Sequence, residues 1–403
     1  MTYENTAEFA SKMDEADPLK NHRKKFHIPQ VNGVDSIYFC GNSLGLQPVT
    51  VRDSIEQELE DWKNLGVEGH FKGKNPWKDY HEFLTQQLAH VVGAKPIEVV
   101  AMNNLTVNLH LMMVSFYRPT PKRHKIIIEA SAFPSDQYAV KSQILFHGFD
   151  PATSLVEVKI GDDVESYLDD SVALVLLGGV NYYTGQLFNI EKITKAGHAK
   201  GCIVGFDLAH AAGNALLKLH DWNVDFACWC SYKYLNGGPG CVAGCFVHEK
   251  FADDTSLPRF AGWWGHDKAS RFKMGPDFKA IPGAEGWQLS NPSIFGMAPL
   301  KASLEIFYEA KIENLRKKSE QLTGYLEFLL HGKCEIMTPK NPAERGCQLS
   351  IRAKSKKVHE ALTKAGVICD WREPDCIRVA PVPLYNTFTD VYLFAKIFTE
   401  ASQ

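Results

Sequence analysis

Short apolar runs alternate with amphipathic segments through the first two thirds of the chain. Runs rich in β-branched, aromatic and other apolar residues predict buried strands at 99–102, 125–129, 155–159, 172–177, 203–206 and 226–229. Between them, apolar residues recur every three or four positions, which predicts helices at 105–117, 190–199 and 209–219. This alternation predicts an α/β fold with a mostly parallel sheet and helices on both of its faces.

The same patterns predict further elements on both sides of this region. Helices are expected at 6–16, 51–65, 77–92, 356–365 and 390–399, one or two long helices at 298–325, and strands at 37–40, 241–247, 347–352 and 376–380. The short strands and helices of the last third indicate a separate α+β unit. We therefore expect residues 51–297 to form a large α/β domain, and residues 1–50 with 298–403 to form a smaller α+β domain.

Composition narrows the classes of function. Of the 403 residues, 45% are hydrophobic and 23% are charged, as in globular proteins, and the formal net charge of −3 gives no reason to expect a nucleic-acid partner. The first twenty residues contain no apolar core of a signal peptide, and no apolar run approaches the length that spans a membrane. Ten cysteines are too few for a disulfide scaffold. We expect a cytoplasmic protein that binds neither membranes nor nucleic acid.

Lys233 is the first candidate for chemistry. It follows the apolar run 224–230, stands between Tyr232 and Tyr234, and precedes a glycine-rich turn at 237–240. A partly desolvated amine loses its proton more easily, so it can attack a carbonyl and form a Schiff base. The alternative is a structural lysine that extends from a strand end into solvent.

Asp207 ends the preceding apolar run. Because α/β sheets bind ligands at the carboxyl ends of their strands, we expect Asp207 and Lys233 to face one crevice. An amine and a carboxylate at opposite ends of a pyridine ring are what pyridoxal 5′-phosphate requires, since the acid keeps the ring nitrogen protonated. Asp207 could instead cap the helix that we expect to follow it.

Three further signals fit such a cofactor. Thr106 follows an Asn-Leu pair where a strand turns into a helix, and helix N-termini bind phosphate, although an ordinary Asn cap explains the same pattern. Phe133 stands at a strand end, where an aromatic ring can stack on a flat ligand. His210 could reach the phosphate or the ring, or be structural.

Two other patterns carry less weight. The segment 238–243 fits a loose dinucleotide-binding fingerprint but lacks the following helix and the distant ribose-binding acid. The cysteines near residues 228–245 lie in apolar strands at spacings that zinc sites do not use, so no metal is expected.

Taken together, four segments resemble kynureninases, pyridoxal-phosphate enzymes of fold type I that are related to the class V aminotransferases. These segments are 133–136, 206–210, 231–236 and 378–386, and with 41–45 they place the resemblance over nearly the whole chain. It implies a seven-stranded sheet in the large domain and a homodimer. It also implies hydrolysis of the Cβ–Cγ bond of L-kynurenine or 3-hydroxy-L-kynurenine to anthranilate or 3-hydroxyanthranilate and L-alanine, in tryptophan catabolism and NAD biosynthesis.

The resemblance also implies residue roles. Lys233, Asp207 and Tyr232 are the expected catalytic residues. The expected cofactor site comprises Lys233, Asp207, His210, Tyr232, Leu105, Thr106, Phe133, Pro134, Ser135, Asp136, Asn291 and Trp263, the last reaching across a dimer interface. The expected substrate site comprises Arg378, which binds the α-carboxylate, with His70, Ser43 and Asn291 at the aromatic end. His70 and Asn291 resemble the form that favours the hydroxylated substrate.

The sequence departs from the family pattern at Gly178, where a serine or threonine hydroxyl is expected. One cofactor contact is therefore missing or supplied by another residue. The alternative functions are another reaction on the same cofactor, such as that of a cysteine desulfurase or aminotransferase, and a binding protein that has lost its chemistry. A desulfurase needs a reactive cysteine on a mobile loop, whereas Cys347 and Cys376 adjoin strand-like segments.

Overall fold

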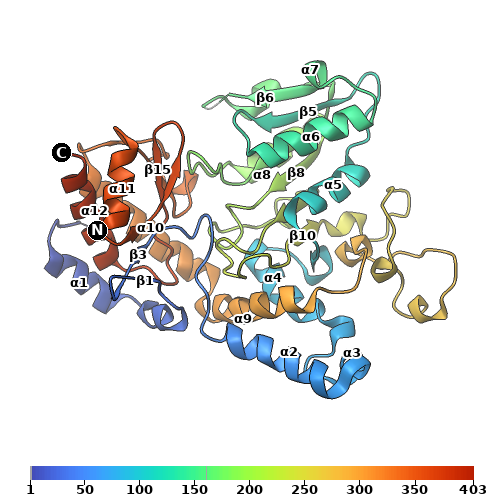
Figure 1. Ribbon diagram of the computed structural model, residues 1–403. Helices are drawn as coiled ribbons and strands as arrows, with labels where there is room; N and C mark the ends of the chain where they lie inside the picture. The colour runs from blue at the N-terminus through green and yellow to red at the C-terminus, as the bar shows by residue number, and fades with distance from the viewer. Residues whose placement is uncertain (1, 160) are drawn as a thin grey trace.

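The computed structural model describes residues 2–159 and 161–403, and its centre is a seven-stranded sheet (Figure 1). In spatial order the strands are β4 (Val99–Ala101), β10 (Gly244–Val247), β9 (Phe226–Trp229), β8 (Ile203–Asp207), β7 (Val172–Gly178), β5 (Lys125–Glu129) and β6 (Leu155–Val158). β10 is antiparallel to both neighbours, and the strands from β9 to β6 pair in parallel. The predicted fold class is confirmed.

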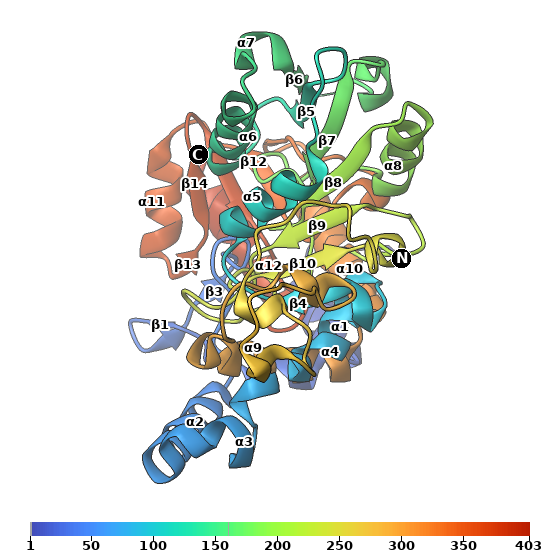
Figure 2. The same cartoon turned by 90° about the vertical axis from the view of Figure 1, so that its right-hand side faces the viewer.

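Helices lie on both sides of the large sheet (Figure 2), and alternating side chains of its strands belong to two different core clusters. Ile126 and Ile128 are buried with α5 (Leu105–Phe116) and α6 (Pro134–Phe146). Ile127 belongs to the cluster on the other face, which includes side chains of the helices α4 (Glu82–Val92), α8 (Ile190–Ala199) and α9 (Ile294–Ala310). Burial on both faces explains why these strands are continuous apolar runs in the sequence.

A second unit combines the two ends of the chain, and both termini lie in it (Figure 1). Its antiparallel sheet has the order β11 (Glu335–Ile336), β12 (Leu349–Arg352), β15 (Cys376–Val379) and β14 (Asp370–Arg372). Its helices are α1 (Ala7–Ala16), α10 (Ile312–Leu330), α11 (Lys356–Lys364) and α12 (Phe388–Ala401). Strand β3 (Ile37–Tyr38) pairs with β13 (Val367–Ile368), which ties the N-terminal segment to the C-terminal one.

The smaller elements complete the two units. They are the hairpin β1 (Gln30–Val31) and β2 (Val34–Asp35) and the short helices α3 (Gly69–Lys72) and α7 (Pro151–Ser154). α9 packs against α2 (Val51–Leu65) and α4, so its apolar side chains belong to the core of the large sheet. We propose the two-domain division, and its boundaries remain predictions.

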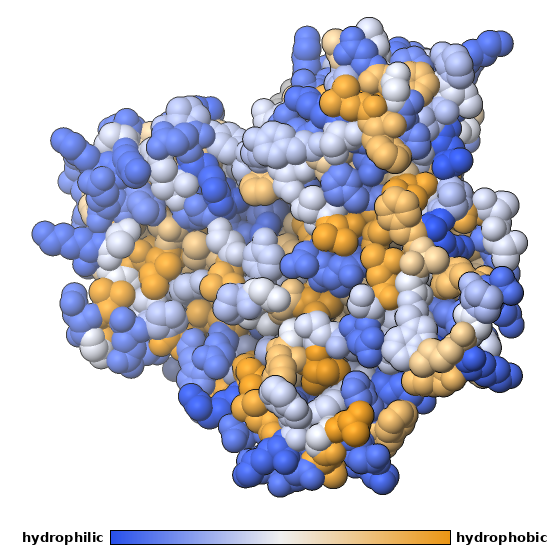
Figure 3. All heavy atoms as spheres, turned by 45° about the vertical axis from the view of Figure 1, so that its right-hand side comes forward, coloured by the Kyte–Doolittle hydropathy of each residue, from blue (hydrophilic) through white to orange (hydrophobic). Residues whose placement is uncertain are grey.

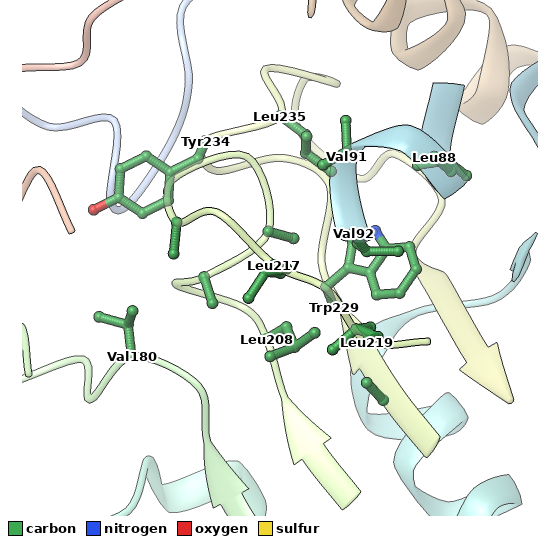
Figure 4. Packing of buried hydrophobic residues seen from close by; sticks show 14 of the residues in the cluster. Leu88, Val91, Val92, Val180, Leu208, Leu217, Leu219, Trp229, Tyr234 and Leu235 are labelled. Carbon is green, nitrogen blue, oxygen red and sulfur yellow. The ribbon is translucent and has the colours of Figure 1, made fainter. Parts of the chain in front are cut away.

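The helix predicted at 209–219 is wrong, because this segment forms turns. Gly213 has a positive φ of 78°, and the backbone N–H of Leu219 donates to the carbonyl of Val92, not to a carbonyl of its own segment. Figure 4 shows Leu217 and Leu219 packed near Val91 and Val92 of α4. The apolar residues of this segment are therefore spaced for contacts with α4, and the segment itself is not helical.

The predicted helix 51–65 is confirmed as α2, but its apolar stripe is not fully covered. Trp62 is 58% exposed and Leu59 is 39% exposed, and the ring of Phe295 lies 6.1 Å from that of Trp62. Apolar residues also appear among the polar ones near the lower end of the surface in Figure 3. None of the helices formed by the described residues is long and apolar enough to cross a membrane.

Candidate active site

A cavity of about 270 Å³ lies at the carboxyl ends of β5, β7 and β8. The predicted residues that line it are Leu105, Thr106, Phe133, Ser135, Asp136, Asp207, His210, Tyr232 and Lys233. They come from the N-termini of α5 and α6, from the end of β8, and from the loops that follow β8 and β9. This is the edge of the sheet at which open α/β folds bind ligands.

Lys233 extends into this cavity toward His210. Its Nζ lies 2.9 Å from His210 Nε2, and 5.9 Å from the centre of the Phe133 ring. Burial lowers the pKa of His210 well below its usual value, and the positive charge of Lys233 lowers it further. The imidazole is therefore neutral, and its Nε2 accepts a hydrogen bond from the amine.

Asp207 and Asp136 form a buried pair of carboxyl groups. Burial raises the pKa of both, and the pKa of Asp136 is raised the more, because Asp207 adds like charge and a hydrogen bond to its neutral form. Asp207 is also fixed by the N–H of Ala209, which donates to its Oδ1 at 2.7 Å. Asp136 therefore holds its proton more tightly than Asp207 does, and Asp207 is the one that can carry the negative charge.

Two helix N-termini meet at the cavity. Thr106 in the first turn of α5 and Ser135 in the first turn of α6 place their hydroxyl oxygens 2.7 Å apart. Neither Asn104 nor Phe133, the N-cap residues of these helices, makes a side-chain capping bond to the described residues. The alternative of an ordinary Asn cap is therefore wrong for α5, and the free N–H groups suit an anion.

Arg378 and Ser43 lie together beside the cavity. Arg378 on β15 is 1% exposed, and its Nη1 donates a hydrogen bond of 2.8 Å to the backbone carbonyl of Tyr182. Tyr182 lines the cavity. Its Nη2 forms an ion pair with Asp370, which also accepts a hydrogen bond from the Ser43 hydroxyl. Burial disfavours the charge of Asp370, but Arg378 and Ser43 outweigh it and hold the pKa of that carboxyl below its usual value.

Among the described residues, six predicted site residues do not line the cavity. Arg378 and Ser43 lie beside it, and the other four lie elsewhere. Pro134 only begins α6. Asn291 lines a separate cavity of about 160 Å³ that shares Asn104 with the first. Trp263 is 41% exposed, and His70 on α3 packs edge-on against Trp77, 5.4 Å between ring centres. Within one chain, Trp263 and His70 do not line this cavity.

The cavity also contains residues that the sequence analysis did not identify. Tyr182 and Glu129 line it, and Asp370 holds Arg378. Glu129 is the last residue of β5, so it carries the same signal as Asp207, a carboxylate at the end of an apolar strand. Asp370 gave no such signal, because only the pairing of β14 with β15 places it opposite Arg378.

These residues fit pyridoxal phosphate on the evidence of the cavity itself. His210 Nδ1 is buried and has no hydrogen-bond partner among the described residues. The N-termini of α5 and α6, which lack side-chain caps, place anion-binding N–H groups at the same cavity. An amine lies near one carboxylate, Asp207, which stays available for the ring nitrogen. The charges of the site therefore match those of the cofactor at its phosphate, its ring nitrogen and its aldehyde.

Solved structures with the same architecture define the class. A structure of C-DES with glycine covalently linked to its PLP cofactor superposes with a TM-score of 0.78 at 17% sequence identity, and covers 90% of this chain and 96% of that one. A cysteine desulfurase from Thermococcus onnurineus superposes with a TM-score of 0.76 at 18% identity, over 97% and 98% of the two chains. The fold is that of the fold-type-I enzymes that depend on pyridoxal phosphate.

Sequence relatives narrow the class to one family. The kynureninase of Koribacter versatilis is 61% identical over 98% of both chains, and that of Myxococcus xanthus is 56% identical over 98% of this chain and 97% of its own. The kynureninase of Nematostella vectensis is 50% identical over 98% and 93%. A model of the kynureninase C-terminal domain matches residues 315–398. The chain belongs to the kynureninase family and is a pyridoxal-phosphate-dependent hydrolase of carbon–carbon bonds.

Proposed function

We propose that the protein hydrolyses the bond between Cβ and Cγ of L-kynurenine or 3-hydroxy-L-kynurenine. One water is consumed: its hydroxyl oxygen joins the Cγ carbonyl carbon, and its proton ends on Cβ. The products are anthranilate or 3-hydroxyanthranilate, and L-alanine. The observation that carries the proposal is the cavity where Lys233, Asp207 and two helix N-termini meet beside the buried Arg378.

The chain's own groups would hold the cofactor at three points. The N-termini of α5 and α6, with the hydroxyls of Thr106 and Ser135, would bind its phosphate. Asp207 would accept a hydrogen bond from its ring nitrogen, and Lys233 Nζ would bond to its aldehyde carbon. When bound, pyridoxal phosphate supplies an electron-accepting ring that activates the bonds next to the substrate amine.

Proton transfer would fall to the groups around Lys233. Once its amine is free, Nζ can take the proton from the substrate α-carbon, and neutral His210 keeps Nζ in place through its Nε2. Burial raises the pKa of the Tyr232 hydroxyl, so the phenol stays protonated at neutral pH. Tyr232 is therefore suited to donate a proton, and the carbon left after cleavage needs one.

Arg378 would bind the α-carboxylate of the substrate. Its guanidinium already pairs with a carboxylate, that of Asp370, so the site has the charge and the geometry for such a ligand. A substrate carboxylate has to compete with Asp370 for Nη2. Arg372, which donates to the same Asp370 oxygen at 3.1 Å, can retain that carboxylate when Arg378 turns to the substrate.

A homodimer would complete the site. Trp263 is partly exposed in its own chain, and Trp62 and Leu59 are left uncovered on α2, as expected of a surface that packs on a second copy. We propose that Trp263 joins the cofactor site of the partner, and that His70, Asn291 and Ser43 contact the aromatic end of the substrate. Size-exclusion chromatography with light scattering should give the mass of two chains.

The cysteines favour this function over that of a desulfurase and support a reducing compartment. All ten are free, and burial raises the pKa of Cys347 to about 12 and that of Cys376 to about 11. Such thiols are poor nucleophiles, whereas a desulfurase needs an accessible thiolate. Free thiols are also usual in the cytoplasm, where we place the protein.

Product analysis tests the proposal. The purified holoenzyme is incubated with each of the two kynurenines and, separately, with L-cysteine, and the aromatic acid, alanine and sulfide are quantified. We expect equal amounts of aromatic acid and alanine, with kcat/KM higher for the hydroxylated substrate. Sulfide from L-cysteine without any aromatic product from the kynurenines would contradict the proposal.

A further inference from the structure

Glu129 is a third buried carboxyl group in the cofactor cavity, and the proposed mechanism does not use it. It ends β5, lines the cavity and is 7% exposed. A buried carboxylate is unfavourable unless a partner compensates it. Its presence in the wall of the cavity therefore needs a physical reason.

Gly178 is the residue that holds this carboxyl. The backbone N–H of Gly178 donates to Glu129 Oε2 at 3.0 Å, and a Cβ added at Gly178 would lie 2.7 Å from Oε1. Gly178 on β7 is also the register partner of Asp207 on β8. The missing side chain at position 178, where a hydroxyl was expected, leaves room for the Glu129 carboxyl beside Asp207.

The charges around Glu129 make its ionisation sensitive to what the cavity contains. Burial raises its pKa to about 6, the Gly178 N–H opposes this, and Asp207 adds like charge. The titratable groups that face it are Asp136 from α6 and Asp207 from β8, and the cationic group of the cavity is Lys233. A positive charge brought near Asp207 would also favour the ionised form of Glu129.

We infer that Glu129 is a positioning residue for the cofactor, whose carboxylate, seated on the Gly178 N–H, reinforces the negative charge of Asp207 and strengthens the binding of a protonated pyridine ring. The inference rests on the proposed function, since it assumes that Asp207 meets the ring nitrogen. The expected hydroxyl at position 178 is absent, and the Glu129 carboxyl from the neighbouring strand β5 takes its place beside Asp207.

The first test measures cofactor binding by apoprotein of Glu129→Gln. The substituted amide keeps an oxygen for the Gly178 N–H, so the variant should fold. We expect the ratio of its Kd for pyridoxal phosphate to that of the unsubstituted protein to be near one at about pH 5 and to reach about tenfold at about pH 8. Effects of pH on the free cofactor cancel in this ratio. A ratio that does not change with pH would overturn the inference.

Glu98→Gln is the matched control. Glu98 is another fully buried acid that accepts backbone N–H bonds, from Lys95 and Glu249 at 2.8 Å each, but it does not line the cavity. We expect its Kd ratio to stay near one at every pH. A pH-dependent rise as large as that of Glu129→Gln would show that burial of an acid, not its place beside Asp207, causes the effect.

A double-mutant cycle tests the role of Gly178. Gly178→Ala should displace the Glu129 carboxyl and weaken cofactor binding several-fold at about pH 8, whereas the same substitution added to Glu129→Ala should change the Kd little. Equal effects in both backgrounds would overturn the coupling. Failure of the unsubstituted apoprotein to bind pyridoxal phosphate at all would instead contradict the proposed function, so the two failures are distinguishable.

Discussion

Two clusters of acids and histidines lie beside the large sheet, and they differ in how their polar atoms are hydrogen-bonded. In one, Glu98 accepts hydrogen bonds from His220 Nδ1 at 2.9 Å and from two backbone N–H groups, and the ring of His248 stacks on His220. In the other, Lys233 and His210 face a cavity, and His210 Nδ1 has no partner among the described residues. Buried polar atoms that are hydrogen-bonded to one another indicate a structural cluster. A buried polar atom without a hydrogen-bond partner beside a cavity indicates a ligand site.

The first cluster contains residues that could bind a metal in isolation. The ligand atoms of Glu98, His220 and His248 lie within 4.8 Å of one another. However, His248 Nδ1 already accepts the N–H of Lys250 at 3.1 Å, and both Glu98 oxygens accept backbone N–H groups. The comparison therefore teaches that proximity of ligand-type side chains matters less than whether their lone pairs are free.

The largest expected effect is that of Lys233→Ala. Removal of the amine removes both the attachment to the cofactor and the base at the substrate α-carbon, so kcat should fall by about 10⁴-fold or more. Circular dichroism and thermal unfolding should show an intact fold. Turnover within about tenfold of the unsubstituted enzyme would exclude the proposed role of this lysine.

Arg378→Ala should lower kcat/KM by about 100-fold, mainly through KM, because a charged hydrogen-bonding partner of the substrate carboxylate is lost. Steady-state kinetics measure this split. Arg378→Lys is the matched variant, and it should recover only part of the loss because an ammonium lacks the two-pronged geometry. An unchanged KM in both variants would remove Arg378 from substrate binding.

Glu98→Ala should show the opposite pattern from the cavity substitutions. It leaves the backbone N–H groups of Lys95 and Glu249 and the His220 ring without the buried carboxylate that they bond to, so the free energy of unfolding should fall by about 3 kcal/mol. Measured kcat/KM of the folded fraction should stay within about twofold. Denaturant titration measures the stability and steady-state kinetics measure the activity of the same sample. A loss of activity without a loss of stability would contradict the structural role of the Glu98 cluster.

The smallest effect concerns the stability of the apoprotein against pH. Because the pKa of Glu129 is raised to about 6 in the folded state, the native state binds its proton more tightly than the unfolded state. Stability therefore falls as pH rises through this window, by at most about 2 kcal/mol. Glu129→Gln should flatten this fall in a series of denaturant titrations between about pH 4.5 and pH 7, and an identical slope in both proteins would contradict the shift.

The sequence predicts what depends on local pattern. The bounds of α2, α8, β5 and β9 match the predicted segments, and Asp207 and Lys233 line one cavity, because each ends or follows an apolar strand of a parallel sheet. The segment 209–219 was predicted wrongly because its apolar spacing serves contacts with α4. Neither the Glu129–Gly178 contact nor the Asp370–Arg378 pair could be predicted, since each joins different strands through a register that only the folded sheet fixes.

Reductive trapping tests the central claim most directly. The apoprotein is mixed with pyridoxal phosphate, reduced with borohydride, digested and analysed by mass spectrometry. The account predicts one pyridoxyl adduct, on the peptide that carries Lys233, and its loss in Lys233→Ala. An adduct confined to another lysine, or no adduct at all, would contradict it.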